Sequence, residues 1–263
     1  MREICALLKA GPLPIRRFGR RLLWHKPKLY RWVGKMRGHG DCLMADFDMW
    51  IGGFPRSANT FTSACFKLAN PKVKVASHYH IPAFIINWIQ KRKPGLFLIR
   101  QPVDSVVSWT IFWQGQMKVG EALDYYIDFH RAMLGYREDL FLARFEEAVS
   151  DFAGVVKRLN ARFGTRFSAL PEQPGSLSRC ISYIEDHARG EDGRVNEFTV
   201  SRPSNQRVGL KPKLLEELKG SDRLVRKMEV ADQLYRQFCE GRPHFSHNSH
   251  NRLDAMDITA APV

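Results

Sequence analysis

Several features that would assign this chain to a class are missing from its 263 residues. The longest apolar runs, such as 81–88, are far shorter than the ~18–20 residues of a membrane-spanning helix. The five cysteines include no CxxC pair, which argues against a zinc ribbon or a redox motif, and their low density over 263 residues argues against a disulfide scaffold. Residues 4–8 are too few for the apolar core of a signal peptide. We therefore expect a cytoplasmic protein with reduced thiols and no integral membrane span.

Acidic residues are scarce at the start of the chain. Residues 1–40 contain eleven Lys and Arg but one acid, so they carry +10 of the net charge of +14. Apolar residues at helical spacing predict a short basic amphipathic helix there. We interpret residues 1–44 as a basic arm, 45–240 as the folded domain and 241–263 as a mobile tail. The arm could bind an anionic membrane or polyanion, with aromatic side chains such as Trp24 stacking on bases, or could pack on the domain.

Strand and helix patterns alternate from residue 46 onward. We expect strands at 47–53, 73–77, 96–100 and 140–145, helices at 59–68, 82–91, 103–113, 121–136, 146–163 and 214–240, and loops at 168–178 and 200–213. This alternation predicts an α/β fold, a three-layer sandwich with a central parallel sheet. In such a fold ligands bind at the carboxyl ends of the strands.

Residues 51–62 read Ile-Gly-Gly-Phe-Pro-Arg-Ser-Ala-Asn-Thr-Phe-Thr and predict a strand, a turn and a helix start. Unpaired N–H groups at a helix N-terminus bind anions, and Arg56 adds a cation beside them. Against the nucleotide loop G-x-x-x-x-G-K-[ST], Ala58 replaces the second glycine and Asn59 the lysine. A nucleoside triphosphatase is therefore disfavoured, and a nucleotide with a shorter anionic chain fits better. The alternative is a strand–turn–helix link whose polarity is accidental.

A second candidate segment, residues 100–108, follows the third expected strand. Arg100 ends that strand at the carboxyl edge of the sheet, and Ser108 lies two helical turns further on. Both could face one anion. The alternative is that Arg100 is a solvated cap or a member of a salt bridge.

Together the two segments resemble the sulfotransferases that use 3′-phosphoadenosine 5′-phosphosulfate (PAPS). Residues 54–61 are similar to the family's 5′-phosphosulfate loop, [YF]-P-[KR]-S-G-[TN]-T-W, residues 100–108 to its 3′-phosphate motif, R-[ND]-P-x-D-x-x-x-S, and residues 142–147 to its V-R-Y-E-D strand. The resemblance implies a P-loop-like sulfotransferase fold and sulfonyl transfer from PAPS to a hydroxyl or amine acceptor. The product would be adenosine 3′,5′-bisphosphate, and no metal would be required.

The resemblance also implies a role for individual residues. Arg56 would contact the transferred sulfonyl group, and Arg100 and Ser108 would hold the 3′-phosphate. The 5′-phosphate would lie on five consecutive residues, Ser57, Ala58, Asn59, Thr60 and Phe61. Ala58 departs from the family's glycine, although an alanine with a negative φ can still present its N–H to a phosphate. Phe61 stands for a tryptophan, and Arg207-Val208-Gly209 is the best candidate for an R-K-G segment that also grips the 3′-phosphate.

His80 is the candidate catalytic base. His80-Ile81-Pro82 is similar to the family's H-[LF]-P segment, whose histidine acts as base, and histidine suits base chemistry near neutral pH. Alternation at a strand end would put His78 and His80 on one face. Two surface histidines or a metal pair are the alternatives.

Two other functions stay open at this point. One is a degenerate P-loop kinase that needs Mg²⁺ and ATP, and the other is a binder of membranes or anionic polymers that acts through the arm. The acceptor of a sulfotransferase is not readable from the sequence, although aromatic residues in 109–113 and the basic segment 200–213 are candidates to line its pocket.

Overall fold

The computed structural model describes residues 46–171 and 173–240, together with Trp24, Lys26, Lys28, Leu29 and Trp32. The predicted amphipathic helix and the tail 241–263 lie outside the described residues. Four parallel strands form one sheet in the order β2-β1-β3-β4, with bounds β1 Met49–Gly53, β2 Val75–Ser77, β3 Gly95–Ile99 and β4 Leu142–Arg144. Each of the four expected strands is therefore confirmed to within two residues at either end.

Ten helices of the described chain surround or extend the sheet: α4 Asn59–Ala69, α5 Pro82–Gln90, α6 Pro102–Phe112, α7 Val119–Leu134, α8 Phe145–Ser150, α9 Phe152–Phe163, α10 Ser176–Ala188, α11 Asn205–Val208, α12 Leu210–Lys219 and α13 Asp222–Cys239. The expected helix 146–163 is two helices, because the Asp151 side chain accepts a bond from the Gly154 N–H at 2.8 Å and starts α9 anew. The expected helix 214–240 is likewise broken at Gly220 and Ser221.

Two expectations of loop structure were wrong. The segment 168–178 is a loop only as far as Gly175, where α10 begins, and 200–213 contains α11 and the start of α12. Pro, Gly and Ser residues dominate the start of the first segment and Arg and Lys the second. These residue types are typical of loops, so the sequence did not predict the helices. The helices themselves have short apolar faces because they lie at the edge of the domain.

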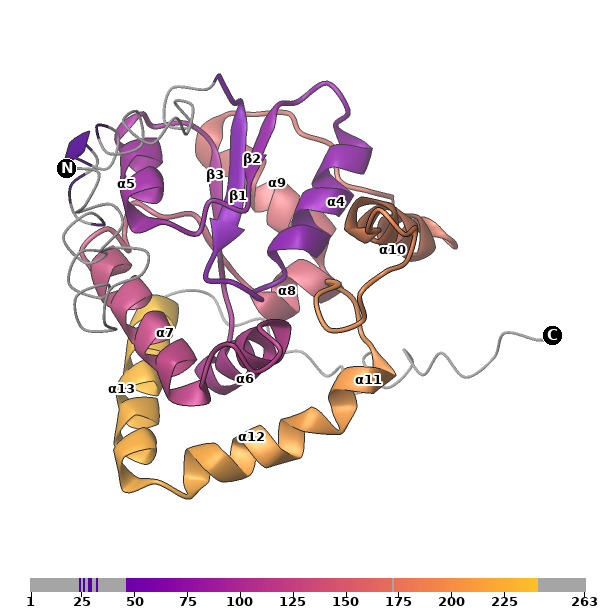
Figure 1. The fold of residues 1–263 in the computed structure, drawn as a ribbon. Helices are drawn as coiled ribbons and strands as arrows, with labels where there is room; N and C mark the ends of the chain where they lie inside the picture. The colour runs from indigo at the N-terminus through magenta and orange to yellow at the C-terminus, as the bar shows by residue number, and fades with distance from the viewer. Residues whose placement is uncertain are drawn as a thin grey trace.

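Helices cover both faces of the sheet, which confirms the α/β class and its central parallel sheet (Figure 1). Met49 and Ile51 of β1 pack with α4, α8 and α9 on one face, whereas Trp50 joins α5, α7 and α13 on the other. In β3, Leu98 and Phe97 divide between the same two faces. Strands covered on both faces are continuously apolar, as their sequences are.

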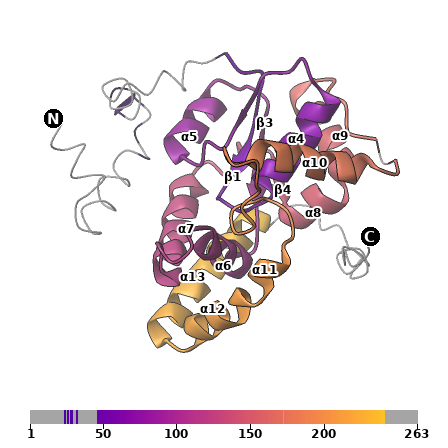
Figure 2. The ribbon, with the colours of Figure 1, turned by 45° about the vertical axis from the view of Figure 1, so that its right-hand side comes forward.

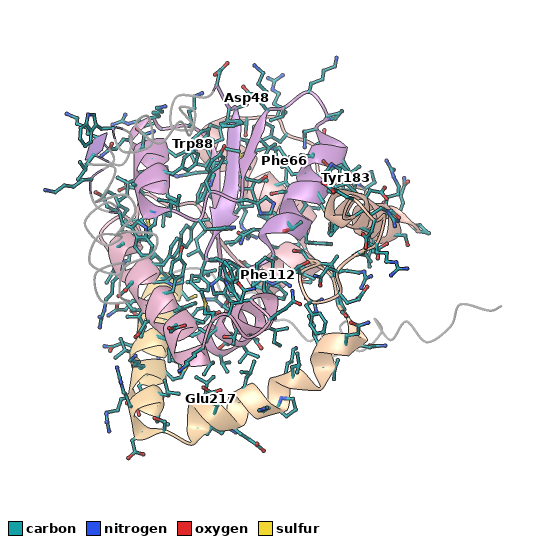
Figure 3. All side chains as sticks on the ribbon, in the orientation of Figure 1. Asp48, Phe66, Trp88, Phe112, Tyr183 and Glu217 are labelled. Atoms are coloured by element: carbon teal, nitrogen blue, oxygen red, sulfur yellow. The ribbon has the colours of Figure 1, made fainter. Side chains whose placement is uncertain are left out.

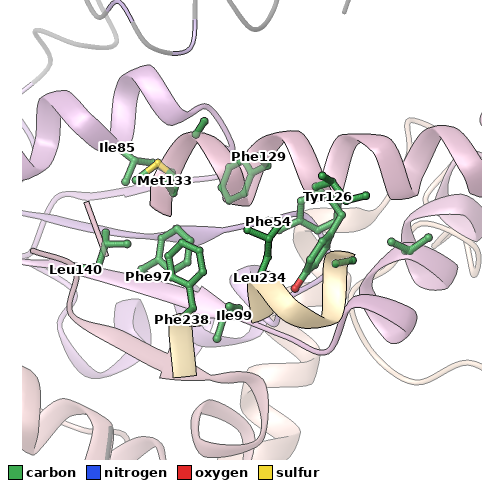
Figure 4. Packing of buried hydrophobic residues seen from close by; sticks show 14 of the residues in the cluster. Phe54, Ile85, Phe97, Ile99, Tyr126, Phe129, Met133, Leu140, Leu234 and Phe238 are labelled. Carbon is green, nitrogen blue, oxygen red and sulfur yellow. The ribbon is translucent and has the colours of Figure 1, made fainter. Parts of the chain in front are cut away.

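The last described helix is part of the core. Phe97 of β3 lies between Phe129 of α7 and Phe238 of α13, with ring centroids 6.1 and 5.8 Å away (Figure 4). Trp24 of the predicted arm joins this core, with its ring centroid 5.4 Å from that of Tyr125 in an edge-to-face arrangement and an exposure of only 3%. Trp24 is therefore not available for stacking on bases, because α7 gives its indole a dry apolar surface instead.

None of the described helices is long and apolar enough to cross a membrane.

The strand order places a topological switch point at β1. β2 and β3 lie on opposite sides of β1, so the chain changes direction there, and by the general rule for parallel sheets a ligand binds in the crevice at such a point. Gly53 pairs with Leu98 across this junction, and a Cβ on Gly53 would lie 2.0 Å from the Leu98 carbonyl oxygen. The last residue of β1 must therefore be glycine for β1 and β3 to pair up to the crevice.

Gly53→Ala should lower the free energy of unfolding by about 3 kcal/mol, because the clash is with backbone that cannot rotate away. Urea denaturation measures this loss. Gly135→Ala is the matched control, since Gly135 has an α-helical φ of −65° and open space around it. Equal stability of the two variants would contradict the proposed strand constraint.

Candidate anion site at the ends of β1 and β3

The loop between β1 and α4 is anchored by its own side chains. Phe54 is fully buried, with its ring centroid 4.9 Å from that of Tyr126. The buried Asn59 amide donates to the Phe54 carbonyl at 2.8 Å, which closes the loop. Arg56 and Ala58 have φ angles of 66° and 67°, in the left-handed region. Ala58 therefore does not meet the condition of a negative φ under which an alanine was expected to present its N–H to a phosphate.

The start of α4 presents unpaired donors. In the described part of the chain the backbone N–H groups of residues 58–61 donate to no other group, as expected for a helix N-terminus without a side-chain cap. The Ser57 hydroxyl is fully buried beside them and has no hydrogen-bond partner. Buried polar groups without partners are rare, so this cluster is suited to hold an anion.

Arg56 reaches from this loop to two distant parts of the chain. Its Nε donates to the Ser108 hydroxyl of α6 at 3.0 Å. Its Nη atoms donate to the carbonyl oxygens of Thr199 at 3.1 Å and Val200 at 3.3 Å, and to the Ser201 hydroxyl at 3.3 Å. All these partners are neutral, so within the described residues no carboxylate compensates the Arg56 charge.

Arg100 lies directly beneath the same loop. Its Nη1 donates to the Arg56 carbonyl oxygen at 3.1 Å, and its guanidinium lies 4.0 Å from the centre of the Phe145 ring. The Tyr126 hydroxyl donates to the Arg100 carbonyl at 3.0 Å and holds the strand end in place. The Asp104 carboxylate is 4.0 Å away and half-exposed, and the buried Arg100 Nε has no partner.

Residues 195–207, named here the strap, cross this end of the sheet between α10 and α11 (Figures 1 and 2). Arg207 is 9% exposed and donates to the carbonyl oxygens of Val200, at 3.0 Å, and Arg202. Arg202 in turn pairs with Glu197 at 2.7 Å and with Glu185 of α10. Arg207 therefore fixes the fold of the strap and does not extend freely into the crevice.

Three guanidiniums consequently share one electrostatic environment. Burial, together with the charges of Arg207 and Arg100, lowers the pKa of Arg56 to about 10. Burial also lowers the pKa of Arg100 and of Arg207. A bound anion would offset this repulsion, because hydrogen bonds between a guanidinium and an anion are stronger than those between neutral groups.

His80 is held at the entrance to the loop. Its Nδ1 lies 2.7 Å from the Gly53 carbonyl oxygen. Because a carbonyl only accepts, Nδ1 carries the proton and Nε2 keeps its lone pair. Burial lowers the pKa of His80 to about 4, so the ring is neutral at pH 7. This is the form that can accept a proton.

His78 lies near His80 as predicted, but for a different structural reason. β2 ends at Ser77, and His78 has a left-handed φ of 64°, so strand alternation does not govern its direction. The two histidine rings nevertheless lie 5.9 Å apart. Burial and Lys67 lower the pKa of His78. Among the described residues, no three His, Cys, Asp or Glu side chains come close enough together to hold a metal ion.

An aromatic cluster borders the cation. The Phe112 ring centre is 5.7 Å from the Arg56 guanidinium, at the end of the sheet toward which β1 runs (Figure 3). Trp109 stacks on Phe112 at 5.0 Å, and Trp113 packs edge-on against both. The indole N–H groups of both tryptophans are buried and find no acceptor among the described residues. The structure therefore brings part of segment 109–113 next to Arg56.

The sequence predicted that one site contains four residues, Arg56, Arg100, Ser108 and His80. It did not predict the contribution of the strap carbonyl oxygens. Thr199 and Val200 contact Arg56 through backbone oxygens, which any residue type supplies. Tyr126 was also missed, since its position within α7 gave no sign that its hydroxyl would reach Arg100.

Comparison with known proteins adds little. No protein-family model matches the chain, and no curated protein sequence matches it. One solved structure, mouse sulfotransferase SULT7A1 complexed with PAP, superposes with a TM-score of 0.38 and 14% identity, over 70% of this chain and 88% of that chain. A likeness of this size does not establish a common function, so the function proposed below rests on the residues of the site.

Ala58→Gly should raise the free energy of unfolding by about 1 kcal/mol, because glycine adopts a φ of 67° without the steric cost that alanine carries. Chemical denaturation measures the gain. The control Ala64→Gly, inside the same helix, should instead destabilise by about 1 kcal/mol or more. A loss of stability at both positions would show that the left-handed turn is not present in solution.

Proposed function

We propose that this protein is a PAPS-dependent sulfotransferase that moves a sulfonyl group to a hydroxyl or amine acceptor and releases adenosine 3′,5′-bisphosphate. The observation that carries the proposal is one hydrogen-bonded group beside the unpaired N-terminus of α4. Arg56, in the loop that leads to this helix, donates to Ser108 and accepts from Arg100, with no carboxylate on Arg56 among the described residues. A nucleotide with phosphates on both its 3′ and 5′ positions has the charge distribution that this arrangement requires.

Each group would have a defined task. The N–H groups of residues 58–61 and the Ser57 hydroxyl would bind the 5′-phosphate, with Asn59 holding the loop closed through Phe54. Arg100 and Ser108 would bind the 3′-phosphate. We assign Arg207 an indirect part, because its side chain is committed to the strap that lies over Arg56.

The transfer step needs a base and stabilisation of developing charge. The acceptor oxygen or nitrogen would attack the sulfur and lose its proton to Nε2 of His80, while the bond between the sulfur and the bridging 5′-phosphate oxygen breaks. Arg56 would stabilise the negative charge that gathers on the sulfonyl and leaving oxygens. His80 and Arg56 come from the ends of neighbouring strands, so one crevice would serve both.

Binding of two nucleotides tests the site. In calorimetry the wild-type protein should bind adenosine 3′,5′-bisphosphate with much higher affinity than adenosine 5′-monophosphate. Arg100→Ala should reduce the ratio of the two affinities at least about tenfold, because it removes a charged donor that would contact the 3′-phosphate and not the 5′-phosphate. Arg162→Ala, an exposed arginine on α9, should leave it unchanged.

Turnover with labelled PAPS separates this function from a kinase. Sulfonyl transfer should continue in EDTA, whereas transfer of phosphate from ATP would need Mg²⁺. Equal binding of the two nucleotides, or transfer from ATP that EDTA abolishes, would overturn the proposal.

The pH profile tests His80 as base. At pH 5 a base with a pKa of about 4 is still about nine-tenths deprotonated, whereas an ordinary histidine would be about 3% deprotonated. Because the pKa of His80 is lowered, the decrease of kcat/KM in acid should begin at a lower pH. The profile should therefore stay flat from pH 8 to about pH 5. His80→Ala should lose about 10²–10⁴-fold in kcat. His187→Ala, an exposed histidine, is the control, and a His80→Ala rate close to wild type would exclude the role.

A further inference from the structure

Two buried thiols from distant parts of the sequence meet beside the site. The Sγ atoms of Cys65, on α4, and Cys180, on α10, lie 2.7 Å apart, although the residues are 115 positions apart in the chain. Their exposures are 4% and 0%. Both are reduced in this structure, and neither position belongs to a motif.

The two thiols are not equivalent. The hydrogen bond from Cys65 lowers the pKa of Cys180, and the same bond, with burial, raises the pKa of Cys65. The shared bond therefore makes the two thiols unequal in acidity, although either sulfur can be its donor. The sulfur that accepts the bond is the one that forms a thiolate more readily and attacks a disulfide.

The pair lies where α10 is attached to the domain. Among the described elements, α10 packs chiefly on α4, around a small cluster of Ala64, Ile184 and Val200 (Figures 2 and 3). Val200 belongs to the strap, and Glu185 of α10 pairs with Arg202 of the strap. The position of α10 on α4 therefore sets the position of the strap over Arg56.

We propose that Cys65 and Cys180 are a thiol–disulfide pair whose oxidation bonds α10, and with it the strap, to the helix that begins at the anion loop. One of the two thiols, as its thiolate, attacks an external disulfide such as oxidised glutathione and forms a mixed disulfide with release of one glutathione thiol. The other protein thiol then displaces the second glutathione. The two protein thiols lose two electrons and two protons, and the oxidant becomes two thiols.

Burial controls the rate of this reaction. Neither sulfur is reachable while α10 is seated, so exchange requires α10 to lift from α4 or takes place before it docks. Once formed, the bond closes a long loop of the unfolded chain and holds α10 down. The strap should then open less often.

Mass spectrometry of the full chain tests the bond. The protein is refolded or incubated in glutathione buffers of graded redox potential, alkylated in denaturant and digested. The expected product is a Cys65–Cys180 peptide about 2 Da lighter than its two thiol peptides, increasing as the buffer becomes oxidising. Cys239→Ser should retain it and Cys180→Ser should lose it. Absence of this peptide from oxidised wild-type protein, or random pairing of all cysteines, would overturn the proposal.

Hydrogen exchange tests the structural consequence without using PAPS or any variant. Oxidised wild-type protein should exchange at least several-fold more slowly than reduced protein in residues 176–207, with little change in β3. Unchanged protection of that segment in protein shown to contain the bond would overturn the link to the strap. Neither measurement depends on sulfonyl transfer, so this inference and the proposed function can fail separately.

Discussion

The hydrogen bonds that the Arg56 guanidinium donates within the described chain all go to neutral oxygens, and the other parts of the site are arranged around that fact. Burying a charge without a counter-charge is costly, and here the cost appears as a pKa lowered to about 10. Carboxylates do exist nearby, but Glu185 and Glu197 are engaged by Arg202. The strap and α10 therefore supply carboxylates to Arg202 and leave Arg56 with neutral oxygens.

The backbone carries its share of the strain at the same place. Left-handed φ angles occur at three residues that follow the ends of β1 and β2: Arg56, Ala58 and His78. Such conformations persist only where the surroundings enforce them. The pairing of Gly53 with Leu98, the Asn59–Phe54 bond and the burial of Phe54 supply that enforcement. The position of Arg56 thus depends on packing in the sheet.

Local pattern was a sound guide where one element determines its own structure. Apolar runs that alternate between two covered faces marked the strands, and a polar turn before a helix marked the anion loop. Pattern failed where a neighbour decides. The start of α10 in a Gly- and Ser-rich stretch, the division of 146–163 by the Asp151 cap, and the burial of Trp24 against α7 all depend on contacts that are distant in sequence or on a single side-chain bond.

By itself the sequence determined the class of fold, and it predicted the end of the sheet where a ligand is expected, with Arg56, Arg100, Ser108 and His80 as candidate residues. Those inferences need only local periodicity and the rule that parallel strands end at one edge. Only the tertiary structure decided that Arg207 serves the strap, that Ala58 is left-handed, that His80 keeps Nε2 free and that Cys65 meets Cys180. Each of these depends on which atoms of remote segments come within hydrogen-bonding distance, and no local pattern encodes that.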